Sequence, residues 1–90
     1  MVAEVIHEQN RFTKTVEGMV CELEYLMTDD CTINFHHTYV PDALRGKGLA
    51  LELIKKGLDF AVSKDFKIIP SCWAVSKFIE RNPNYKEYLR

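Results

Sequence analysis

Two glycines that flank a lysine, directly after an arginine, form the stretch of this 90-residue chain best suited to chemistry. Residues 45–50 read RGKGLA, between an apolar run that ends at Val40 and an amphipathic pattern that begins at Leu49. A strand, a glycine-rich turn and a helix start together present several backbone N–H groups to an anion. Arg45 and Lys47 add positive charge there. The residues predict a phosphate-binding loop, or a tight turn in which the glycines serve only the backbone.

Two common phosphate-binding motifs do not fit this loop. A P-loop requires Ser or Thr after its lysine, whereas Lys47 is followed by Gly48. A Rossmann fingerprint requires a third glycine and an acidic residue after a second strand, and the segment at 64–68 does not supply that arrangement. A glycine-rich loop of another kind is therefore expected.

Four segments of the chain resemble the GNAT acyl-CoA N-acyltransferases, in particular a short single-domain branch of that superfamily. The loop at 45–50 fits the signature Arg/Gln-x-x-Gly-x-Gly/Ala. The other matches are His-Thr-x-Val-Pro at 37–41, Pro-x-Cys at 70–72 and Asn/His-Pro-x-Tyr at 82–85. The four segments occur in order and at the expected spacing, so together they are more specific than the loop alone.

The resemblance implies an α+β fold, a mixed and mainly antiparallel sheet with packed helices, in a minimal form of the GNAT fold. The sheet is expected to splay where the strand ending at Val40 parts from the strand ending at Ile69. Acetyl-CoA is the implied cosubstrate, with its pantetheine arm against Tyr39 and Val40. Its diphosphate is expected on the loop, at Arg45, Gly46, Lys47, Gly48, Leu49 and Ala50.

The implied reaction is direct attack of a neutral amine on the thioester in a ternary complex. Such a reaction needs a base for the amine, hydrogen-bond donors for the oxyanion and an acid for the departing thiolate. The candidates are His37 as the base and Cys72 or Tyr85 as the acid. The alternative for His37 is a core histidine that is hydrogen-bonded to a backbone group. Cys72 lies near a predicted helix start, which favours the thiolate, so a covalent acetyl-cysteine route is a second possibility. Inert packing of Cys72 is a third.

Hydrophobic periodicity predicts the elements that position these residues. Strands are expected at 2–7, 11–16, 19–27, 31–40 and 66–69, and helices at 49–62 and 72–81. The first four strands form an antiparallel meander, and the crossover helix makes the last strand parallel to its neighbour. Along 31–40, strict alternation puts His37 in an apolar row with Phe35 and Tyr39, and puts His36 and Thr38 on the other face. Neighbouring histidines on opposite faces cannot bind one metal together.

Length and composition limit the possible classes of protein. Ninety residues are expected to form one domain over 1–90. A net charge of −1 gives no overall electrostatic attraction to nucleic acid. Cys21, Cys31 and Cys72 are odd in number and lack CxxC spacing, which argues against a disulfide framework and a zinc site. The sequence contains no signal segment and no membrane-spanning run, so a cytoplasmic protein without a metal or a membrane partner is expected.

Larger GNAT enzymes carry two helices between their first strands, for which this chain has no room. The acceptor pocket is therefore expected to be open, or completed by another chain. The sequence predicts an N-acetyltransferase for an unidentified amine, in a small molecule or a protein, that acts as a monomer or weak homodimer. The alternative is a CoA-binding regulatory or interaction module with little or no turnover. Nucleic-acid binding is disfavoured, because the cations are local and no aromatic platform accompanies them.

Overall fold

A computed structural model describes residues 4–90, so the first positions of the strand predicted at 2–7 lie outside the described part. The described elements, in chain order, are the strands β1 (Ile6–Glu8), β2 (Arg11–Val16), β3 (Met19–Asp29) and β4 (Thr32–Tyr39), the helix α1 (Leu49–Ser63), the strand β5 (Lys67–Ile69) and the helix α2 (Trp73–Arg81). Two 3₁₀ helices, η1 (Asp42–Leu44) and η2 (Pro83–Tyr88), follow β4 and α2.

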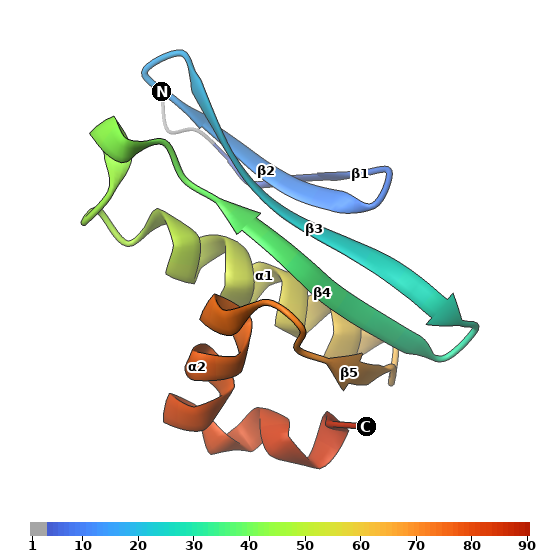
Figure 1. Cartoon of the computed structure of the whole chain (residues 1–90). Helices are drawn as coiled ribbons and strands as arrows, with labels where there is room; N and C mark the ends of the chain where they lie inside the picture. Colours follow the sequence, from blue (N-terminus) through green and yellow to red (C-terminus); the bar gives the residue numbers. More distant parts are fainter. Residues whose placement is uncertain (1–3) are drawn as a thin grey trace.

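The five strands form one sheet in the order β1-β2-β3-β4-β5. Neighbours from β1 to β4 are antiparallel, whereas β4 and β5 are parallel because α1 crosses between them. Helix α1 packs against β2, β3 and β4, and α2 packs against α1 and η2 (Figure 1). The α+β class and the mainly antiparallel sheet predicted from the sequence are confirmed.

Helix α1 buries the apolar stripe that its sequence predicted. The stripe consists of Leu49, Leu53, Ile54, Leu58 and Ala61. Gly57 is also buried, and a Cβ atom there would come within 2.7 Å of Leu23 Cδ2 and 2.9 Å of Phe35 Cε1. The helix lies this close to the sheet because position 57 carries no side chain.

We expect Gly57→Leu to destabilise the fold by at least about 2 kcal/mol, because overfilling a packed core displaces its neighbours. Leu23 and Phe35 are fully buried, so neither side chain can swing into solvent. Lys56→Leu adds the same side chain at an exposed position of α1 and is expected to change stability by less than about 0.5 kcal/mol. Urea unfolding measures both variants. Equal stabilities would contradict the close contact between helix and sheet.

Strand β4 continues past its parallel partner, and the sheet opens where their pairing ends. Residues 32–34 of β4 pair with β5, and the Cys72 N–H then donates to the Phe35 C=O at 2.9 Å. Beyond that hydrogen bond, within residues 4–90, the rest of β4 has no strand neighbour on this side (Figure 1). The predicted splay between the strands ending near Val40 and Ile69 is therefore present.

A β-bulge at His36 corrects the alternation predicted for β4. The cross-strand pairs are Tyr25 with Phe35, Glu24 with His37, Leu23 with Thr38 and Glu22 with Tyr39, so His36 is an extra residue. Directly paired residues share one face of a sheet. Thr38 therefore lies on the helix-covered face with the buried Leu23. The predicted face was wrong for His37 and Tyr39, because the extra residue shifts the alternation by one position.

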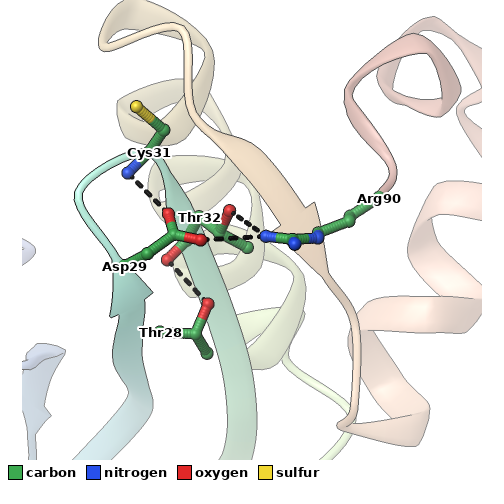
Figure 2. Close-up of polar contacts among 5 residues, drawn as sticks. All are labelled: Thr28, Asp29, Cys31, Thr32 and Arg90. Atoms are coloured by element: carbon green, nitrogen blue, oxygen red, sulfur yellow. Dashed lines mark hydrogen bonds and ion pairs between the residues drawn. The ribbon is translucent and has the colours of Figure 1, made fainter.

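Arg90 is tied to the turn between β3 and β4 (Figure 2). Its Nη1 donates to Asp29 Oδ2 at 2.9 Å and to Thr32 Oγ1 at 2.8 Å, and its backbone N–H donates to the Ile68 C=O at 3.1 Å. The Cys31 N–H, with Arg90 as a further donor, holds the pKa of the Asp29 carboxyl below its ordinary value. These contacts fasten the chain after η2 along β5.

Candidate functional site

A hollow of about 630 Å³ lies where β4 separates from the chain that follows β5. The end of β4, the loop after it, the first turn of α1 and the start of α2 form its walls, which include Thr38, Val40, Gly46, Gly48, Cys72 and Trp73. Most of the lining side chains are apolar, and the polar ones are Thr38, Cys72 and the charged Arg45. This size and lining are typical of small-molecule pockets.

The loop at 45–50 is shaped by two glycines in the left-handed region, Gly46 with φ 84° and Gly48 with φ 77°. Gly48 is the N-cap of α1, and the first helical hydrogen bond runs from the Glu52 N–H to its C=O at 3.1 Å. The N–H groups of Leu49 and Ala50 therefore have no acceptor within the helix. A Cβ atom at either glycine would meet nothing within 4 Å, so the backbone faces open space. A positive helix end with free N–H groups suits a phosphate.

The two cations of the loop are exposed and engaged with neighbouring groups. Arg45 Nε lies 3.3 Å from the Val40 C=O and 3.3 Å from Asp42 Oδ1. Lys47 Nζ lies 3.5 Å from Glu17 Oε2, in the turn between β2 and β3. Exposed pairs of this kind contribute little stability, so either side chain can turn toward an anion at low cost.

Cys72 and Thr38 meet across the opening of the sheet. Cys72 is the N-cap of α2 and is half-buried, and its Sγ lies 3.2 Å from Thr38 Oγ1. The first hydrogen bond within α2 runs from the Ser76 N–H to the Cys72 C=O at 3.0 Å, so the thiol sits beside the free N–H groups of a helix start. The expectation that Cys72 lies in the splay at the start of a helix is confirmed.

His37 and Tyr39 do not place their side chains in the hollow. Both are exposed, opposite Glu24 and Glu22 on the face that α1 does not cover. The predicted apolar row through His37 was therefore wrong, and its role as a base stays a prediction. The backbone of Tyr39 precedes Val40, which lines the hollow, so the predicted backbone contact with pantetheine also stays a prediction.

Tyr85 is hydrogen-bonded to a residue of α1 and lies outside the hollow. Its hydroxyl donates to Asp59 Oδ1 at 2.7 Å, and Lys55 Nζ donates to the other carboxylate oxygen at 3.0 Å. Burial, followed by the hydrogen bond to Asp59, raises the pKa of the Tyr85 hydroxyl. Tyr85 does not line the hollow and instead fastens η2 to α1, so we do not retain it as the acid.

Two residues of the site were missed by the sequence analysis. Thr38 was assigned to the other face by strict alternation, and only the bulge at His36 brings it inside. Trp73 stands at the first turn of α2, outside the buried pair Val75 and Ile79, and is 74% exposed. A tryptophan off the apolar stripe of a helix was the one available sign that it serves a purpose other than packing.

Over residues 4–90, His, Cys, Asp and Glu side chains form no group of three or more placed to hold a metal ion. None of the helices there has the length and apolar character needed to cross a bilayer.

Comparison with known families gives an independent result. The family model described as GCN5-related N-acetyl-transferase matches residues 11–88 of the chain. Protein NATD1 of Gallus gallus is 37% identical over 93 residues, which cover 97% of this chain and 84% of that protein. Protein NATD1 of Homo sapiens is 37% identical over 92 residues, with 96% and 81% covered.

A solved structure resembles the fold described above. It is the solution structure of a GCN5-like protein from Staphylococcus aureus, considered a candidate N-acetyltransferase, and it superposes with a TM-score of 0.77. The two sequences are 28% identical, and the match covers 97% of this chain and 87% of the other.

Proposed function

The chain belongs to the GCN5-related N-acetyltransferase family, and on that premise we propose that it transfers an acetyl group from acetyl-CoA to an amine. One observation carries the proposal. The open, left-handed loop at 45–50 and the Cys72–Thr38 pair lie on the walls of the same hollow. A ligand with a diphosphate at one point and a thioester at another matches that arrangement.

The residues of the hollow fit acetyl-CoA. The free N–H groups at the start of α1, with Arg45 and Lys47, are suited to a diphosphate. The apolar walls suit the pantetheine arm, and the unpaired end of β4 offers backbone groups to its amides. When bound, acetyl-CoA supplies a thioester as the acetyl donor.

Side chains of this protein would donate and accept the protons of the reaction. Cys72 Sγ and Thr38 Oγ1 are 3.2 Å apart, and a proton can be held between them and given to a departing thiolate. His37 is suited to act as a base only for an amine that approaches from the uncovered face of the sheet. The class of the amine is left open between small molecules and proteins.

The alternative is a CoA-binding regulatory or interaction module with little turnover. One observation favours it: His37 and Tyr85, two of the three predicted catalytic residues, do not line the hollow.

We also propose that residues 1–90 form one domain, because the described apolar residues share one core. The free thiols of Cys21, Cys31 and Cys72 suit a reducing compartment such as the cytoplasm. A monomer or weak homodimer remains our expectation.

Addition of acetyl-CoA tests the proposal directly. At a ligand concentration of about 100 times Kd, the free energy of unfolding should rise by about 2.7 kcal/mol. For a domain of this size the melting temperature should rise by roughly 10–20 °C. Release of the CoA thiol in the presence of a panel of primary amines then measures turnover. Stabilisation without turnover would favour the binding module, and no stabilisation would contradict both functions.

A further inference from the structure

The face of the sheet that α1 does not cover carries a row of charged side chains. Successive cross-strand pairs join Glu8 of β1 to Arg11 of β2, Arg11 to Glu24 of β3, and Glu24 to His37 of β4. Directly paired residues share one face of a sheet, with Cβ atoms about 4.5–5.5 Å apart. Acidic and basic groups therefore alternate across the four antiparallel strands.

A hollow of about 470 Å³ lies over the middle of this row. We call it the outer hollow, and the hollow of the candidate site the inner hollow. Of the described residues, none lines both. The outer hollow has a size typical of small-molecule sites, and its lining combines both signs of charge with an apolar side chain. The residues that matter here are Arg11, Glu24, Leu26 and His36.

The outer hollow reaches β4 at the point where the sheet opens. The last contact that closes the sheet is the hydrogen bond from the Cys72 N–H to the Phe35 C=O, and His36 is the next residue along β4. His36 lines the outer hollow, whereas Thr38, two residues further on, lines the inner hollow. A small molecule in the outer hollow can therefore reach past the free edge of β4 toward Cys72 and Thr38.

The two charged groups of the outer hollow have unused binding capacity. The Glu24 carboxylate is half-buried and forms no ion pair with any side chain of residues 4–90. Arg11 Nη1 lies 3.3 Å from Glu22 Oε1, and the buried Nε of Arg11 has no hydrogen-bond partner in the same range. A guanidinium carries five N–H donors, so several remain. An ammonium on Glu24 and a carboxylate on Arg11 would satisfy both groups.

We propose that the outer hollow binds a free α-amino acid as the acceptor, with its ammonium on Glu24 and its carboxylate on Arg11. The inference rests on the proposed function, because only an acetyl donor in the inner hollow makes a bound amine an acceptor. A lysine or terminal amine of a protein has no free carboxylate beside it, so Arg11 favours the free amino acid. Leu26, which is 52% exposed, offers an apolar contact to the side chain of the amino acid.

The same placement gives His37 a proton to accept, because it lies directly opposite Glu24. The amine nitrogen forms a bond to the acetyl carbon, and the C–S bond of the thioester breaks. Of the three ammonium protons, one goes to His37 and on to solvent, one goes by way of Cys72 to the departing thiolate, and one stays on the amide nitrogen. The products are an N-acetyl amino acid and CoA.

Matched pairs of ligands test the two charges. Each of the twenty common L-amino acids is compared with the amine that its decarboxylation gives, for example L-leucine with isoamylamine. Calorimetric titration into protein saturated with CoA measures binding without turnover, and release of the CoA thiol from acetyl-CoA measures the rate. We expect at least one amino acid to bind and react, with an affinity and a kcat/KM about tenfold or more above those of its amine. That is the effect of one hydrogen bond between charged groups.

Two variants assign the charges to residues. Arg11→Gln should reduce the preference for the amino acid over its amine by about tenfold, because only the amino acid carries the carboxylate. Glu24→Gln should weaken both ligands by about tenfold and leave their ratio unchanged, because both carry the ammonium. Arg81→Gln, which removes an exposed arginine on α2, is the control and should leave both affinities unchanged. Circular dichroism and an unchanged CoA affinity verify that each variant keeps its fold.

The outcomes separate this inference from the proposed function. The amino-acid site is overturned if no amino acid binds to the CoA complex, if the decarboxylated amines are preferred, or if a lysine-containing peptide reacts faster than every amino acid. An unchanged ratio in a folded Arg11→Gln variant would overturn it as well. In each of these cases acetyl-CoA still stabilises the protein and the proposed function stands. Failure of acetyl-CoA itself to bind would remove the proposed function.

Discussion

Gly48→Val is expected to weaken CoA binding by about 100-fold. Gly48 has φ 77°, a backbone conformation in which a β-branched residue is strained, so valine should force the start of α1 to rearrange. The free N–H groups there are the proposed donors to the diphosphate, and hydrogen bonds to a charged group contribute about 1.5–3 kcal/mol each. Loss of one strong or two weaker bonds corresponds to the expected change, which calorimetric titration with CoA measures.

Gly18→Val is the matched control for backbone strain. Gly18 also has φ 77°, and a Cβ atom there likewise meets nothing within 4 Å, but it lies in the turn between β2 and β3. Its neighbour Glu17 pairs with the exposed Lys47, so CoA affinity should change by at most about fivefold. Equal affinities of Gly48→Val and the wild type, with the fold intact by circular dichroism, would show that the diphosphate does not lie on this loop.

The glycine-rich loop could be predicted because its features are local in sequence. Positive φ at Gly46 and Gly48, and a helix that begins at Leu49, follow from the residue types and from the apolar stripe of α1. The splay of the sheet was implied by the family resemblance, and the end of the strand at Pro70 and Ser71 was read from the residues themselves. Local propensity and local pattern agree at these positions.

Hydrophobic periodicity alone could not predict which side chains face the hollow. Whether Thr38 or His37 faces the helices is decided by one extra residue at His36, and a bulge has no fixed signature in a single sequence. The motif at 82–85 suggested a catalytic role for Tyr85. Its hydroxyl is instead hydrogen-bonded to Asp59, 26 residues earlier in the chain, which holds it away from the hollow. Such long-range partners follow from packing rather than from spacing.

The three cysteines illustrate the same limit. Strict alternation along the strands predicted at 19–27 and 31–40 places Cys21 and Cys31 on apolar faces. Cys21 is indeed buried, which raises the pKa of its thiol. Cys31 instead lies in the turn before β4 and is exposed. High reactivity alone can therefore not identify Cys72, because Cys31 is open to reagents. Protection by a bound ligand can.

Cys72→Ala is expected to slow acetyl transfer by about 100-fold or more and to leave CoA affinity within about threefold of the wild type. That loss is the typical contribution of a positioned proton donor. Thr38→Val removes the hydroxyl 3.2 Å from Cys72 Sγ but keeps the shape of the side chain, so a smaller loss of rate is expected. Cys31→Ala, in the exposed turn, is the control and should leave the rate unchanged.

Mass spectrometry of alkylated protein tests the placement of Cys72 before any acceptor is known. CoA should protect Cys72, which lines the hollow, and should leave labelling of the exposed Cys31 unchanged. Cys21, at 0% exposure, should remain unlabelled in the folded protein. Acetylation of Cys72 on incubation with acetyl-CoA alone would indicate a nucleophile, whereas protection without acetylation would fit an acid. If Cys72→Ala lowers stability but leaves the rate and the CoA affinity unchanged, the thiol serves packing alone. If CoA does not change the labelling of Cys72, the ligand binds elsewhere.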